Sequence, residues 1–115
     1  MARKPLAAND LRDRVAFDQR GTAADDYGNV ETTYAEQFVV AAQIRFLRGT
    51  EPVIAERLQG VQPVVITVRS SEETRGVDTS WRVRDTRTGA LYNIRSVTPT
   101  DDRAFIDILS EAGRG

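Results

Sequence analysis

The sequence contains no cysteine and no histidine. Without cysteine the chain forms no disulfides, no thiolate metal sites and no thiol nucleophile. Without histidine it lacks the side chain whose ordinary pKa lies nearest neutrality, which serves as general base, proton shuttle or metal ligand. These two absences disfavour most hydrolase and metalloenzyme mechanisms. We therefore expect no enzyme activity, no cofactor and no metal.

Long apolar runs are absent as well. No run approaches the roughly 20 residues that a helix needs to span a bilayer. The opening Met1-Ala2-Arg3-Lys4-Pro5 is not followed by the apolar stretch of a secretory signal. We expect a soluble protein that is made in the cytoplasm and has no membrane partner.

An excess of either charge is also missing, because 16 basic and 17 acidic residues leave a formal net charge of −1. The chain therefore has no overall positive field to hold a polyanion, and it would meet nucleic acid only locally. Lys4 is the only lysine, so nearly every basic residue is arginine. Arginine suits bidentate contacts with carboxylates at protein interfaces, although genomic base composition is the simpler explanation.

The length of 115 residues suits one domain, with a core large enough to hold without disulfides. We expect a single domain over residues 1–115. Residues 1–12 are small or polar, show neither strand nor helix period, and form an N-terminal arm, ordered or mobile.

Alternation of apolar and polar residues predicts two strands in the first half of the chain. Residues 14–20 put Val15 and Phe17 on one face, and Gly21 is expected to end this strand. A turn follows over residues 22–29, and the chain is extended again from Val30. The strongest strand pattern covers residues 38–47. One face of it is wholly apolar and consists of Phe38, Val40, Ala42, Ile44 and Phe46.

Four further strands are predicted after residue 60, over residues 63–69, 80–85, 90–97 and 104–109. Before them, Thr50 as N-cap and a helical spacing of apolar residues predict one short helix that stops at Gly60. Short strands separated by turns, with one helix between them, predict a mainly β fold. We expect a small antiparallel β-barrel or sandwich of about six strands with one short helix in a loop.

Two acidic pairs, Asp25-Asp26 and Asp101-Asp102, resemble carboxylates for acid-base work or for a hard cation. Neither pair has further ligands at the spacing of a calcium loop, and aspartate is common in turns for backbone reasons. We favour turns for both pairs. Ser70-Ser71 lacks a histidine or nearby lysine to activate a hydroxyl, so we predict no catalytic residue there.

Arginine and aromatic residues gather in the second half of the chain. They are Arg69, Arg82, Arg84 and Arg95, with Trp81 and Tyr92. One interpretation is a basic stripe with stacking platforms for single-stranded nucleic acid. The interpretation we favour pairs these arginines with Asp85, Asp107 and Glu111 on a solvated face and puts Trp81 in the core.

Five segments together resemble a known family. They are Leu11-Arg12-Asp13-Arg14-Val15, Asp26-Tyr27-Gly28-Asn29-Val30, Ala42-Gln43-Ile44-Arg45-Phe46-Leu47-Arg48-Gly49-Thr50-Glu51, Val65-Ile66-Thr67-Val68-Arg69 and Tyr92-Asn93-Ile94-Arg95-Ser96-Val97. In number, order and spacing they resemble the head-tail joining family of tailed bacteriophages, also called head-closure, stopper or head-tail adaptor proteins.

The chain departs from that family in three places. Ala41 stands where the family often has tryptophan, and Phe46 where it often has proline. Residues 70–79 have no clear counterpart in the family's pattern.

The resemblance implies a β-barrel that assembles as a homo-oligomeric ring in the neck of a phage or phage-derived particle. Such a ring bridges the DNA-filled head and the tail. Its partners are the portal or adaptor ring on the head side and the tail tube or tail terminator on the tail side. It helps to close or gate the channel through which double-stranded DNA passes without sequence recognition. A nearly neutral chain suits that role, since a strongly basic lining would trap DNA.

By the same resemblance, the predicted helix and the later polar loop face neighbouring subunits or the channel. The candidate interface residues are Arg48, Glu51, Val53, Ile54, Arg57, Leu58, Glu72, Glu73 and Arg75. Reversing the charge of Arg48 or Arg57 is expected to spare folding and block assembly. Two alternatives stay open, an oligonucleotide-binding barrel and a tail terminator or completion protein.

Overall fold

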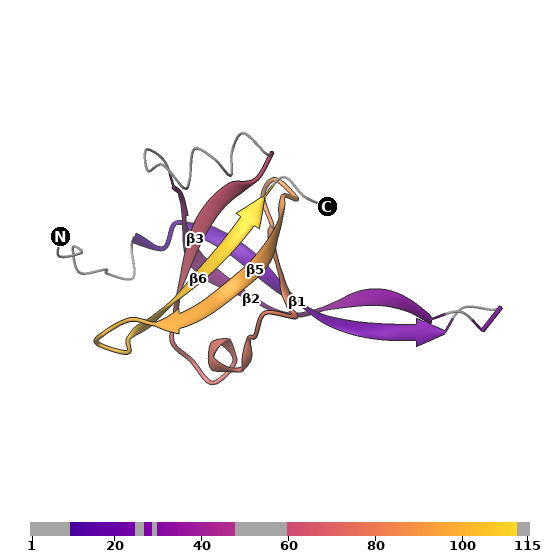
Figure 1. Cartoon of the computed structure of the whole chain (residues 1–115). Coiled ribbons are helices and arrows are strands. Elements are labelled where there is room, and N and C mark those ends of the chain that lie inside the picture. Colours follow the sequence, from indigo (N-terminus) through magenta and orange to yellow (C-terminus); the bar gives the residue numbers. More distant parts are fainter. Residues whose placement is uncertain (1–9, 25–26, 29, 48–59, 113–115) are drawn as a thin grey trace.

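The computed structural model describes residues 10–24, 27–28, 30–47 and 60–112, and in this part of the chain six antiparallel strands form one closed barrel (Figure 1). The strands are β1 (Asp13–Ala24), β2 (Val30–Phe46), β3 (Gln62–Arg69), β4 (Arg82–Asp85), β5 (Leu91–Pro99) and β6 (Phe105–Ala112). Around the barrel they follow the order β1-β2-β3-β6-β5-β4. The prediction of a mainly β fold is confirmed, and the closed order decides for a barrel over a sandwich.

The barrel closes where β1 meets β4. Val15 lies opposite Asp85 and Asp18 opposite Arg82. Just past β4, the backbone N–H and the hydroxyl of Thr86 both donate to the carbonyl of Arg14, at 3.1 and 3.0 Å. Closure gives each of the six strands a neighbouring strand on both sides.

The core follows the alternation of the sequence, because side chains at every second position of a strand point the same way. Val15 and Phe17, predicted on one face, are both fully buried. The inner positions of the other strands are equally apolar and comprise Val64, Ile66, Val68, Val83, Ile94, Ile106 and Ile108. The predicted apolar face of β2 also packs on this core, except for Phe46, which is 47% exposed at the end of the strand.

The prediction that Gly21 ends the first strand is wrong. Gly21 lies opposite Thr33 in the middle of a ladder that continues to Ala24, and the second strand runs unbroken from Val30 to Phe46. A glycine weakens a strand but does not end it when its partner is in place. The predicted helix over residues 50–60 lies outside the described residues, apart from Gly60, whose φ of 81° suits a turn.

The loop between β3 and β4 is folded by Thr74, at the start of the short 3-10 helix η2 (Thr74–Gly76). Its hydroxyl donates to the carbonyl of Arg69 at 2.8 Å and accepts from the N–H of Ser71 at 2.8 Å. Thr74 is 1% exposed, and Val77 just after it belongs to the core. The loop is thereby tied to the barrel at both its start and its middle.

Tyr92 lies inside the barrel and is 4% exposed. Burial raises the pKa of its hydroxyl above the ordinary 10.0, and the nearby charges of Asp85 and Asp13 raise it further. A folded chain that holds this proton more tightly than the unfolded chain loses stability as the pH rises above the ordinary pKa.

We expect Tyr92→Phe to be less sensitive to base than the wild type. The free energy of unfolding of the wild type should fall from about pH 10 upward, and that of the variant should fall less, because phenylalanine has no proton to lose. Urea denaturation between about pH 9 and about pH 11 measures both slopes. Tyr34→Phe is the matched control for the loss of a tyrosine hydroxyl, since Tyr34 is 38% exposed. Equal slopes for the wild type and Tyr92→Phe would contradict a raised pKa of the buried Tyr92 hydroxyl.

A second prediction concerns Ser110, whose buried hydroxyl has no hydrogen-bond partner in the described part of the chain. Removing an unpaired buried hydroxyl relieves its desolvation cost, so Ser110→Ala should keep the wild-type stability or gain about 1 kcal/mol. The matched change is Thr67→Val, because the Thr67 hydroxyl donates to Asp107 at 2.6 Å. This change should cost about 1 kcal/mol. Thermal unfolding of both variants tests the contrast, and a loss in Ser110→Ala would count against it.

Candidate functional site

A two-stranded ribbon projects from the barrel (Figure 1). β1 pairs with β4 only over residues 15–18, and β2 pairs with β3 only over residues 42–46. Beyond the barrel, residues 19–24 and 30–37 pair only with each other. We call these two segments the hairpin arm.

A β-bulge marks the point where the hairpin arm leaves the barrel. Phe17 lies opposite Phe38 and Asp18 opposite Glu36, so Gln37 is the extra residue. The Gln37 side chain donates to the carbonyl of Ala35 at 3.1 Å. A bulge bends its strand and increases the local twist, which re-aims the segment that follows. The sheet therefore turns away from the barrel at this bulge.

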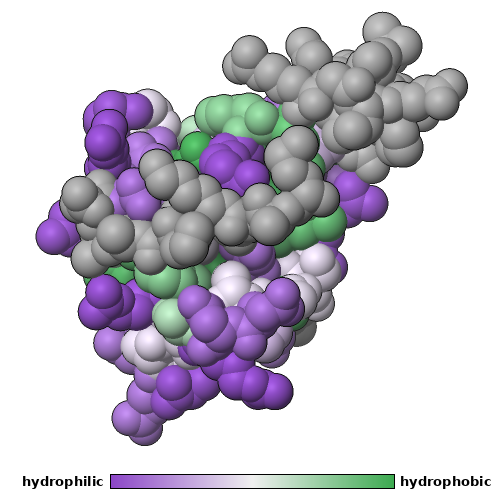
Figure 2. All heavy atoms as spheres, turned by 90° about the vertical axis from the view of Figure 1, so that its left-hand side faces the viewer, coloured by the Kyte–Doolittle hydropathy of each residue, from purple (hydrophilic) through white to green (hydrophobic). Residues whose placement is uncertain are grey.

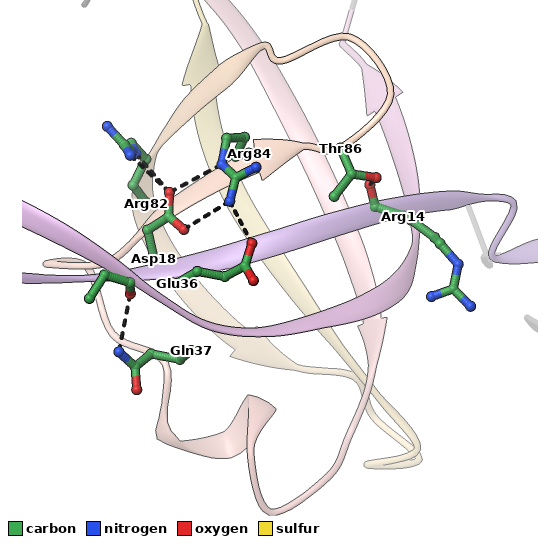
Figure 3. Close-up of polar contacts among 8 residues, drawn as sticks. Arg14, Asp18, Glu36, Gln37, Arg82, Arg84 and Thr86 are labelled. Atoms are coloured by element: carbon green, nitrogen blue, oxygen red, sulfur yellow. Dashed lines mark hydrogen bonds and ion pairs between the residues drawn. The ribbon is translucent and has the colours of Figure 1, made fainter.

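Four charged side chains bind both arm strands to β4, and we call them the arm-base cluster: Asp18, Glu36, Arg82 and Arg84 (Figure 3). Arg82 donates to one Asp18 oxygen through Nε and Nη2, at 3.2 and 2.9 Å. Arg84 donates from Nη2 to Glu36 at 2.7 Å and to Asp18 at 3.5 Å. These hydrogen bonds, that of Glu36 first, raise the pKa of Arg84.

Burial makes the pairing of Asp18 obligatory. Asp18 is 2% exposed, and a buried carboxylate is costly unless charge and hydrogen bonds compensate it. The same Arg82 guanidinium lies 4.1 Å from the centre of the Tyr34 ring, a cation–π contact with the arm. β4 thus holds β1 through Asp18 and β2 through Tyr34 and Glu36.

Aromatic rings support the arm from the inner side of the barrel wall. The ring centres of Phe17 and Phe38 are 5.1 Å apart, and those of Phe38 and Trp81 are 6.0 Å apart. Trp81 packs against the core, as predicted. Because charge holds the outer side and aromatic packing the inner side, the base of the arm is fixed on both faces.

The predicted basic stripe forms in part, with different partners. Arg82 and Arg84 lie together on the outer surface, but they bind Asp18 and Glu36, whereas Asp85 is buried and accepts from the N–H of Arg87. The predicted pairing of Glu111 is found with Arg95, at 3.9 Å.

The oligonucleotide-binding alternative needs Tyr92 as a stacking platform. Tyr92 is inside the barrel and 4% exposed, so it presents no ring face to a base. The two central arginines of the stripe are also engaged by carboxylates. The structure gives this alternative no open stacking surface at Tyr92.

The predicted interface residues fall into two groups. Glu72, Glu73 and Arg75 are exposed on the loop that Thr74 folds. The others lie outside the described residues, and they are Arg48, Glu51, Val53, Ile54, Arg57 and Leu58.

The structure describes only one of the two acidic pairs, Asp101-Asp102. Asp25 and Asp26 lie outside the described residues. Asp102 accepts from the Thr100 hydroxyl at 2.7 Å and from the N–H of Ala104 at 3.0 Å, and both bonds lower its pKa. These contacts confirm the turn interpretation for Asp102. Within the described residues, no three acidic side chains come together as metal ligands would.

Apolar side chains reach the outer surface beside the arm. Strand register places Val39, Ala16, Arg84 and Leu91 in one row across β2, β1, β4 and β5. Val39 is 39% exposed and Leu91 is 42% exposed. On the side away from the arm, apolar residues are also visible among hydrophilic ones (Figure 2). No helix in the described part of the chain is long and apolar enough to cross a membrane.

A family model described as phage head completion protein matches residues 6–113. The chain belongs to this family. The resemblance to head-tail proteins of bacteriophages is therefore confirmed, and this head completion protein is a structural component of the virion. No curated protein matches the chain.

Two solved structures share the fold. The solution structure of protein SF1141 from Shigella flexneri 2a has a TM-score of 0.66 at 20% identity, covering 90% of this chain and 93% of that one. A chain in the virion of a native gene transfer agent particle has a TM-score of 0.61 at 15% identity, covering 88% and 93%. At these identities the likeness concerns the fold of the head completion protein alone.

The arm-base cluster predicts unequal effects of two substitutions. Asp18→Asn removes the charge that Arg82 and Arg84 share at a buried position, so we expect the free energy of unfolding to fall by about 1–3 kcal/mol. Glu36→Gln is the matched control. The Glu36 side chain is 51% exposed, and exposed ion pairs contribute little. Urea denaturation of both variants measures the difference, and equal losses would contradict the role of burial.

Proposed function

We propose that several copies of this head completion protein form a ring that joins the DNA-filled head to the tail and helps to close the DNA channel. The observation that carries the proposal is the hairpin arm, a rigidly based projection on a small barrel from a phage head completion family. A projection fixed at its base suits a heterologous contact, in which one face of a subunit meets a different face of the next.

The function we propose is geometric and involves no catalysis. The portal or adaptor ring is the partner on the head side, and the tail tube or terminator is the partner on the tail side. The fold shared with a chain of a gene transfer agent virion supports a place in such a particle. The net charge of −1 suits a channel wall along which DNA moves without being held.

Two segments complete the proposed contacts with neighbouring subunits or with the channel. The first is the predicted helix segment with Arg48, Glu51, Val53, Ile54, Arg57 and Leu58. The second is the folded loop, on which Glu72, Glu73 and Arg75 are exposed. Both segments carry charges of both signs, which suits pairing between copies.

Removing the protein from a producing strain tests the proposal. We expect DNA-filled heads without tails, and restoration of tailed particles by the wild-type gene supplied separately. Electron microscopy counts the tailed and tailless heads and locates the protein in complemented particles. Normal tailed particles without the protein, or a position away from the neck, would refute the proposal.

Charge reversal tests the proposed helix segment separately. Arg48→Glu and Arg57→Glu should fold with the wild-type thermal midpoint but reduce tailed particles at least about tenfold, because like charges across an interface cost several kcal/mol. Circular dichroism of the purified variants checks the fold, and particle counts check the assembly. Normal yield from both variants would remove this segment from the interface.

A further inference from the structure

The hairpin arm has two unpaired strand edges. Within the barrel each strand lies between two neighbours, but residues 19–24 and 30–37 have only each other. The outer edge of each segment therefore presents backbone N–H and C=O groups without a strand partner in the described chain. A two-stranded ribbon is only marginally stable in water, and open edges are templates for further pairing.

The arm has few of the features that normally protect an edge. Natural sheets block open edges with charged side chains, lysine above all, with proline or with a bulge along the strand. The arm sequence contains neither lysine nor proline, and its bulge lies at the base. The described side chains from Gln19 to Gly21 and from Thr32 to Gln37 are all exposed. In these residues Arg20 and Glu36 are the only charged side chains, and no proline, lysine or mid-strand bulge blocks either edge.

Gly21, near the middle of the arm, has no explanation within the chain. It is not among the glycines with positive φ, and an added Cβ would meet only the Thr33 hydroxyl, at 3.6 Å, an ordinary contact. A larger residue would therefore fit. Glycine inside a strand weakens it and often marks a place where another backbone approaches closely.

We propose that the β1 edge of one hairpin arm pairs with the β2 edge of the arm of an adjacent copy. The proposal rests on the multi-copy ring proposed above. Since β1 and β2 are antiparallel, rotation about a ring axis brings the β2 edge of one copy beside the β1 edge of the next in antiparallel order. The contact is heterologous, so it repeats around the ring without using one surface twice.

Charge favours the pairing of unlike edges. Arg20 on β1 and Glu36 on β2 lie on the same face of the arm, since Arg20 lies opposite Tyr34 and Asp18 lies opposite Glu36. Pairing β1 with β2 therefore brings unlike charges to one face of the joined sheet, whereas pairing β1 with β1 would bring two arginines together. Opposite charges on facing strands stabilise a sheet, and like charges destabilise it. The β1 edge of one copy thus pairs with the β2 edge of a second copy.

Single-cysteine variants test this arrangement, because the chain has no cysteine of its own. Gln19→Cys labels the β1 edge, and Thr33→Cys labels the β2 edge on the same face, since Gln19 lies opposite Ala35 and Gly21 opposite Thr33. The two variants are co-expressed in the producing strain, and purified particles are oxidised. We expect at least about fivefold more disulfide-linked dimer than in particles with either variant alone, because a disulfide forms only between close Cα atoms.

Two further variants make the test decisive. In a second mixture Ala35→Cys replaces Thr33→Cys, because the two paired edges could be offset by two residues along the strands. Thr86→Cys, in the exposed turn after β4, replaces Gln19→Cys as the control and should give only background cross-linking with Thr33→Cys. Equal cross-linking in particles with one variant alone would mean that like edges meet, and would overturn the proposal. So would the absence of any Gln19 cross-link in particles that contain wild-type amounts of the protein.

The amount of wild-type protein in the particle neck is measured first by electron microscopy. Its absence from the neck would contradict the proposed function itself. Its presence without arm-to-arm cross-links would leave the ring intact as a proposal and remove only the pairing of the arms.

Discussion

The structure depends on the pairing of one buried carboxylate, that of Asp18. This residue is the last position at which β1 has neighbours on both sides, so it lies at the boundary between barrel and arm. Its charge is compensated by Arg82 and Arg84, both from the strand that closes the barrel. Because an unpaired charge at this depth is costly, the contacts that close the barrel also determine how the arm leaves it.

The bulge and the arm-base cluster act together. The extra residue Gln37 bends the sheet where β2 passes from barrel to arm. Tyr34 and Glu36, on the arm side of the bulge, are held by Arg82 and Arg84. The bulge sets the direction in which the arm leaves the barrel and the cluster holds that direction, so the ribbon projects from a fixed base. A projection with a fixed base would lower the conformational entropy lost on binding in the proposed ring.

Much of the barrel could be predicted from the sequence, because alternation of apolar residues is a local signal. Val15, Phe17 and the apolar face of β2 were correctly expected to face the core. The length of the arm was not foreseen. Gly21 and the segment before Val30 resemble a turn region by composition, and only the cross-strand register extends both strands past the barrel.

The partners of the arginines were missed for a related reason. Asp18 and Arg82 are 64 residues apart, and no periodicity links them. The sequence suggested nearby Asp85 as a partner, but alternation puts Asp85 and Arg84 on opposite faces of β4, and Asp85 is buried. If the sequence had shown that β1 and β4 are neighbours, it would have predicted this ion pair, since Asp18 is the carboxylate directly opposite Arg82.

Closure by β4 has a consequence for synthesis on the ribosome. The hairpin of β1 and β2 is local and complete once Phe46 has been added, but its first strand gains a second neighbour only when Asp85 has emerged. At about 5–20 residues per second, the nascent chain spends several seconds with this edge uncovered. Pairings between strands so distant in sequence also form slowly. During that interval the apolar side of the hairpin is exposed, which makes the half-made chain a substrate for holding chaperones before it becomes a building block.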